Sequence, residues 1–192
     1  MAKPLTFDDI KRAIISSLSP ELLEKQYREQ LTPDDPPETG HCAIASEAFY
    51  HIAGGKSAGF IPTVCGYAAD GHGNMKYGAE REEALRKGWR KESHWWIKGP
   101  KGGKRGEGKL FDVTVGQFPD PFPYEKGHNT GFMQPKQIPS KRAQIVIDRV
   151  AEKLGKQALD AYKKANMAAF KPEVPVNHPK HRSHRAAHSP HT

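Results

Sequence analysis

Cysteine is scarce in this chain of 192 residues, which contains two. Two cysteines cannot build a disulfide framework, so we expect reduced thiols and a cytoplasmic location. Long apolar runs are also missing. None approaches the roughly 18 residues that cross a bilayer, and residues 1–9 lack the apolar stretch of a secretory signal. We therefore expect no membrane partner.

Negative charge is in short supply, and the deficit is uneven along the chain. The net charge is +8. Residues 1–39 carry a net charge of −3, residues 40–140 of +4 and residues 141–192 of +7. The basic C-terminal region permits weak nonspecific contact with nucleic acid, although no base-reading module is recognisable. A solvated basic surface is the commoner explanation of such a charge, and both interpretations stay open.

Residues 1–39 are predicted to form N-terminal helices followed by a proline-rich linker. Thr6 and the acidic residues after it are typical of a helix start, and apolar spacing predicts a helix over residues 6–18. Ser19 and Pro20 indicate the start of a second helix. The proline-rich residues 32–37 then end regular structure.

Residues 40–139 are predicted to form the core. A compact helix runs from Cys42 to about Ala53 and ends at two glycines. The expected strands cover residues 60–67, 93–98 and 109–115, with a short charged helix over residues 77–88. Residues 119–139, rich in proline and glycine, are predicted to cross the fold as an extended segment.

The remaining chain divides in two. Residues 140–170 carry an apolar stripe at helical spacing, which predicts a long C-terminal helix that packs on the core. Gly155 weakens the expectation that this helix is continuous. Residues 171–192 consist largely of histidine, arginine, proline and serine, and we expect a disordered tail.

Three segments carry the residue types of a thiol acyl-transfer site. Cys42 follows a glycine at the start of a helix, where the helix dipole and unpaired N–H groups favour the nucleophilic thiolate. Those N–H groups also suit an oxyanion. His94 on a strand would accept the proton of Cys42, and Asp112 on the next strand would orient the imidazole.

The order of these segments resembles the transglutaminase-like superfamily, a branch of the papain-like cysteine fold. Its members show a Gly-x-Cys helix, a strand that ends in Gly-Tyr, a His-x-Trp strand and an Asp-x-Thr strand. The matching segments here are Gly40-His41-Cys42, Ile61 to Tyr67, His94-Trp95-Trp96 and Asp112-Val113-Thr114. The match covers residues 40–118, less than half of the chain.

The resemblance implies an α+β fold with a catalytic helix packed on an antiparallel sheet, flanked here by additional helices. It also implies a Cys42–His94–Asp112 triad, a thioester intermediate and no cofactor. The substrate would be a peptide, a protein or another amide, and the reaction hydrolysis or transfer onto an amine. The chain departs from the family at Thr63, where an arginine is common, and in a longer loop over residues 99–108.

Further residues are candidates for contact with the substrate or the oxyanion. His41 adjoins the nucleophile, although a solvated turn residue is the commoner case. Trp95 and Trp96 point to opposite faces of their strand, so one is expected in the core and the other in the cleft. Gln117 and Gln30 are candidate side-chain donors to the oxyanion.

Other interpretations of the same residues remain open. Cys42 is also compatible with an unreactive buried cysteine, and His94 with a packed structural histidine. The triad would then belong to a binding module without catalysis. Cys65 lies in an apolar strand and is expected in the core. A zinc site would use Cys42, Cys65, His51 and His72, but their spacing is not a ligand pattern, and we predict no metal.

Overall fold

The computed structural model describes residues 3–100, 108–118, 121–132 and 138–170. The helices are α1 (Phe7–Ile15), α2 (Lys25–Arg28), α3 (Cys42–Ala53), α4 (Gly78–Arg86), α5 (Lys141–Leu154) and α6 (Lys156–Ala169). The strands are β1 (Ile61–Ala69), β2 (Met75–Lys76), β3 (Arg90–Lys98), β4 (Leu110–Phe111) and β5 (His128–Asn129). The fold class is α+β, as expected.

The N-terminal region begins as predicted and then departs from the prediction. Thr6 caps α1 through a capping box with Asp9, which satisfies N–H groups that the first turn leaves unpaired. The second predicted helix is wrong. Its residues form a single 3-10 turn at Pro20–Leu22 and the four-residue α2, and the two leucines after Pro20 are buried.

The C-terminal helix also differs from the prediction, since it consists of two helices. Gly155 separates α5 from α6 with φ of 85° and ψ of 131°, a conformation that glycine adopts without strain. Both helices contact α3, so the prediction that this region packs on the core is confirmed. The predicted disordered tail, residues 171–192, lies outside the described residues.

The sheet is antiparallel, with the strand order β2-β1-β3-β4 and with β5 paired to β1. β1 and β3 pair along nine residues, and this ladder places Cys65 directly opposite His94. β4 is shorter than the predicted strand 109–115. Asp112 ends it, because its carboxylate accepts a hydrogen bond from the backbone N–H of Thr114 at 2.9 Å and so turns the chain.

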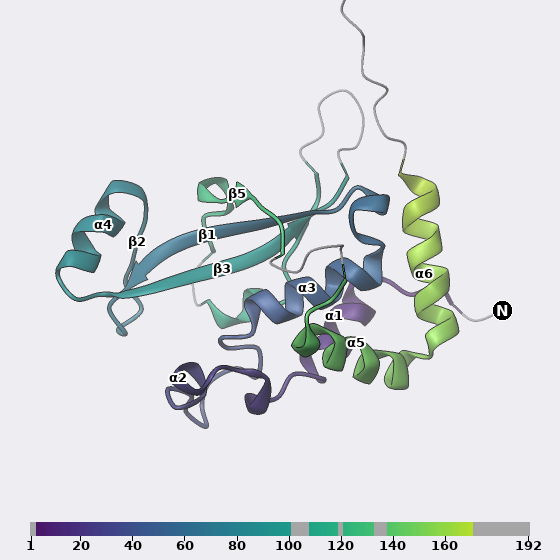
Figure 1. The fold of residues 1–192 in the computed structure, drawn as a ribbon, viewed down its shortest axis with the longest axis horizontal. Coiled ribbons are helices and arrows are strands. Elements are labelled where there is room, and N and C mark those ends of the chain that lie inside the picture. Colours follow the sequence, from purple (N-terminus) through teal and green to yellow (C-terminus); the bar gives the residue numbers. More distant parts are fainter. Residues whose placement is uncertain (1–2, 101–107, 119–120, 133–137, 171–192) are drawn as a thin grey trace, which may run out of the picture.

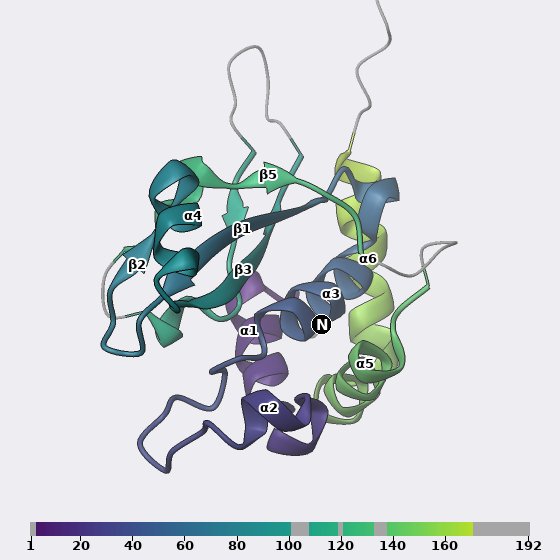
Figure 2. The same cartoon turned by 60° about the vertical axis from the view of Figure 1, so that its left-hand side comes forward.

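Two layers make up the molecule. Figure 1 shows the long β1–β3 ladder on one side, with α1, α3, α5 and α6 gathered on the other, and Figure 2 shows the same division after rotation. α3 contacts β3 of the sheet and also α1, α5 and α6. The main core forms between the layers, and its largest fully buried members are Phe49, Ile10, Ile14, Ile97, Val113, Val146 and Val150.

An aromatic cluster covers the opposite face of the sheet. Trp96 is fully buried there, and Phe118, Phe122 and Tyr124 pack over it from the segment after β4. Phe122 and Tyr124 lie within residues 119–139, which the sequence predicts as an extended crossing, and Phe118 lies just before them. The two tryptophans lie on opposite faces of β3, since Trp96 points into the aromatic cluster and Trp95 toward the helices.

Within the described part of the chain, no helix combines the length and apolar character needed to span a bilayer.

Candidate functional site

Cys42 is the first residue of α3 and lies beside an open edge of β3. Within the part of the chain that the structure describes, β4 pairs with β3 at Ile97 and Lys98 alone, and the β3 carbonyls before them have no strand partner on that side. The helix supplies the partners. The Cys42 thiol donates to the Ser93 carbonyl at 3.4 Å, and the Ser46 hydroxyl donates to the Trp95 carbonyl at 2.9 Å.

Burial dominates the acidity of this thiol. Removal from water raises the pKa of Cys42 to about 12, although hydrogen bonds from the backbone of Trp95 and Ala43 act in the opposite direction. The helix N-terminus alone would favour the thiolate, as the sequence suggests, but desolvation outweighs it. The resting sulfur is therefore a thiol that donates to Ser93, and it needs a base to become a nucleophile.

His94 and Asp112 form a buried pair. Nε2 of His94 lies 2.7 Å from Oδ2 of Asp112, and the histidine side chain is fully buried. Because an ionised carboxylate only accepts, Nε2 carries the proton in this pair. Nδ1 is then free to accept, and the amide of Gln117 lies 3.3 Å from it. In this tautomer Nδ1 is the basic nitrogen of His94, and it faces the Gln117 amide.

Two further donors hold Asp112 in place. The backbone N–H of Thr114 reaches Oδ1, and the Tyr124 hydroxyl reaches Oδ2 at 2.7 Å. Burial and then the hydrogen bond to Asp112 raise the pKa of Tyr124 above its usual range. No sequence motif marks Tyr124 as part of this site. It lies 12 residues after Asp112 in a segment without periodic pattern, so only the folded chain brings the two together.

A cleft of about 580 Å³ contains Cys42. Gln117 lines the same cleft and also contacts Nδ1 of His94. The structure thus joins His94 to Asp112 directly, and Gln117 both contacts His94 and lines the cleft of Cys42. Among the described residues, no hydrogen bond joins Cys42 to His94, and His94 does not line the cleft. The remaining walls come from residues 27–40 and Ala43, from the β1–β2 end of the sheet, from Phe118 and from Arg90, Glu92 and Ser93 of β3.

The other candidate residues occupy different places. His41 is buried, not solvated, and its ring nitrogens lie 3.0 Å from the carbonyls of Thr39 and Ser19, so it is absent from the cleft wall. The Trp95 side chain stacks on Phe132 and likewise does not line the cleft. Gln30 lines the cleft and accepts a hydrogen bond from Arg90.

Cys65 is a core residue, as expected. It is 2% exposed and lies opposite His94 in the β1–β3 ladder, and its thiol donates to the Gly66 carbonyl at 3.7 Å. In the described ranges, no three histidine, cysteine, aspartate or glutamate side chains gather closely enough to hold a metal ion.

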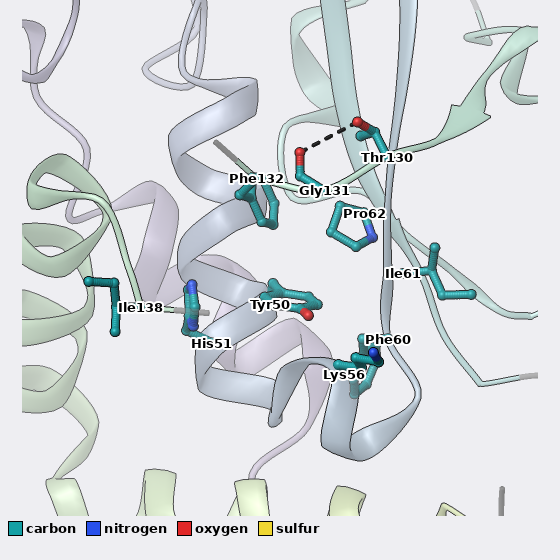
Figure 3. A pocket seen from close by; sticks show the side chains of 10 residues that line it. All are labelled: Tyr50, His51, Lys56, Phe60, Ile61, Pro62, Thr130, Gly131, Phe132 and Ile138. Carbon is teal, nitrogen blue, oxygen red and sulfur yellow. Dashed lines mark hydrogen bonds between the residues drawn. The ribbon is translucent and has the colours of Figure 1, made fainter. Parts of the chain in front are cut away.

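A second cavity, of about 360 Å³, lies toward the other end of α3. Figure 3 shows Tyr50 and His51 entering it from α3, with Pro62 and Phe132 on the facing side. Its lining is mostly apolar and contains one histidine, whose pKa burial lowers. It has no cysteine or carboxylate in its wall, so it lacks the parts of an acyl-transfer site.

Comparison of the chain with protein-family models, with curated proteins and with solved structures gives no match. The chemistry of the site therefore has to be argued from its own geometry.

Proposed function

We propose that this protein is a cysteine-dependent hydrolase or acyltransferase that acts on a peptide or amide bond, built on a papain-like, transglutaminase-like core. One observation carries the proposal. His94 is held by a buried carboxylate at one ring nitrogen and turns the other toward the residue that shares a cleft with Cys42. A purely structural histidine has no need of that arrangement beside a cysteine at a helix N-terminus.

The reaction follows from these positions. His94 Nδ1 takes the proton of Cys42 as the sulfur attacks the carbonyl carbon, and Asp112 stabilises the imidazolium that forms. In this proposal the N–H groups at the start of α3 receive the oxyanion, and Gln117, which lines the cleft, is the candidate side-chain donor. The imidazolium then returns its proton to the leaving amine. Water or a second amine attacks the thioester and releases Cys42.

The rate of Cys42 alkylation by iodoacetamide tests the first step, with Cys65→Ala as the background protein. A thiol with a pKa of about 12 is ionised in about one molecule in 100,000 at pH 7. Labelling near neutral pH then depends on His94 as a base, and we expect His94→Gln to slow it about 100-fold. Mass spectrometry of the modified peptide identifies the site.

The matched control is His51→Gln, which changes a half-buried histidine on α3 that lines the other cavity. Its labelling rate should equal that of the background protein. A second arm uses an activated ester such as p-nitrophenyl acetate, which should leave an acetyl group on Cys42 and none in Cys42→Ser. Equal labelling of the His94→Gln and background proteins would refute the proposed function.

A further inference from the structure

Glu92 brings negative charge into the cleft of a basic chain. It lies two residues before His94 on β3, so the two side chains share one face of the strand. Glu92 lines the same cleft as Cys42, and its negative charge also acts on the thiol. The Glu92 carboxylate disfavours the Cys42 thiolate. Its presence in the cleft therefore indicates a role other than activation of the thiol.

The Glu92 carboxylate is poorly paired. Its side chain is 20% exposed, and burial raises the pKa of the carboxyl. Its one ion-pair contact within the described ranges is Arg90 Nε at 3.9 Å, the outer limit for such a pair, and none of the hydrogen bonds there involves it. Arg90 is itself bound to Gln30. The charge of Glu92 is therefore available to a ligand.

Two phenol rings flank this carboxylate. Tyr67 is the residue opposite Glu92 in the β1–β3 ladder, and Tyr27 lines the cleft from the N-terminal region. Burial raises the pKa of both tyrosines; the charge of Glu92 is the next cause for Tyr27, and for Tyr67 it follows that of Cys42. A carboxylate beside aromatic rings attracts an ammonium or guanidinium group through ion pairing and cation–π contact.

We propose that the cleft selects substrates that carry a cationic side chain beside the carbonyl attacked by Cys42, and that Glu92 recognises that cation. The proposal rests on the proposed function for the identity of the nucleophile. It adds the substrate class, a peptide or amide with an ammonium or guanidinium group.

Charge-matched thiosulfonates test the selectivity without a known substrate. In each case the Cys42 sulfur attacks the sulfenyl sulfur, a mixed disulfide forms and methanesulfinate leaves with the bonding electron pair. The rate ratio of 2-aminoethyl methanethiosulfonate to methyl methanethiosulfonate is measured in the Cys65→Ala background and divided by the ratio for free 2-mercaptoethanol. We expect a preference of about tenfold for the cation, and a ratio within about twofold of one in Glu92→Gln.

Two variants control for charge and for folding. Glu29→Gln removes an exposed carboxylate that directly follows α2 and does not line the cleft, and it should keep the full preference. Glu92→Asp retains the charge and should keep most of it. Because loss of the Glu92 charge favours the thiolate, the rate with the neutral reagent should rise in Glu92→Gln and stay unchanged in Glu29→Gln. The urea midpoint of each variant shows that the protein is still folded.

The outcomes separate this inference from the proposed function. A ratio near one in the background protein, or a preference that persists in Glu92→Gln, overturns the role of Glu92. A rate with the neutral reagent that ignores His94→Gln overturns the proposed function instead, whatever the charge ratio. Loss of the preference in Glu92→Gln alone supports the inference.

Discussion

Asp112 is held by donors of three different kinds: an imidazole, a backbone N–H and the phenol of Tyr124. Such a carboxylate has little freedom to rotate, and the imidazole it binds is fixed with it. The phenol draws part of the carboxylate charge away from His94, since both donate to Oδ2. Tyr124 is thus a positioning residue that also adjusts how strongly Asp112 favours the protonated imidazole.

Replacement of Tyr124 by phenylalanine tests this role. Without the phenol, Asp112 loses one of its donors and the imidazole that it binds is held less firmly, so Cys42 alkylation near neutral pH should slow by roughly threefold to tenfold. Tyr77→Phe is the control, because the Tyr77 hydroxyl donates to a methionine sulfur away from Asp112. An equal rate in Tyr124→Phe and in the background protein would show that the phenol does not position the imidazole.

The residues of the site differ in how far the sequence alone predicts them. Cys42, His94 and Asp112 could be proposed from the sequence because each lies in a short pattern with its own local meaning. Gln117 was a candidate without a motif, and the structure places it at Nδ1 of His94. The burial of His41 depends on a carbonyl 22 residues earlier in the chain, and no local pattern carries that information.

Elements were predictable where hydrophobic periodicity and end signals agree. α3 has the predicted bounds because apolar residues, a preceding turn and two terminal glycines all indicate the same helix. The strand expected over residues 109–115 is short because an aspartate side chain turns the backbone, which β-propensity does not register. The prediction of a second N-terminal helix is wrong because its leucines pack into the core from an irregular segment.

The turn before β5 depends on close contact with the aromatic cluster. Gly127 has an ordinary φ of −82°, but a Cβ there would overlap the ring of Trp96. We expect Gly127→Ala to lower the free energy of unfolding by about 1–3 kcal/mol. Urea denaturation measures this change.

Gly131 provides the comparison, because a Cβ at that position meets nothing within 4 Å. Gly131→Ala should change the free energy of unfolding by less than about 0.5 kcal/mol. Equal effects of the two substitutions would show that loss of glycine flexibility, and not contact with Trp96, sets the cost.

At the scale of the whole molecule, buried acids make the fold sensitive to alkali. Burial raises the pKa of Cys42 and of Tyr77 to about 12, and it raises that of Tyr67 beyond its usual range. Each group binds its proton more tightly when folded than when unfolded. Their contribution to stability is complete below the unfolded values, about 8.5 for cysteine and 10 for tyrosine, and is lost as the pH rises through the folded values.

We therefore expect the free energy of unfolding to fall as the pH rises from about 8.5. Cys42→Ser removes the group whose contribution begins to fall at the lowest pH. The free energy of unfolding of this variant should therefore change less with pH than that of the wild type between about pH 8.5 and 10. Urea denaturation across this range gives both curves. Parallel curves would show that the Cys42 thiol does not titrate differently in the two states.

The central place of α3 links the site to the stability of the whole fold. This helix contacts α1, α5, α6 and β3, and its first residue is the proposed nucleophile. A partial opening that exposed α3 would have to break the main core at the same time, so its free energy approaches that of global unfolding. Cys42 therefore keeps its position in the cleft for as long as the native state persists.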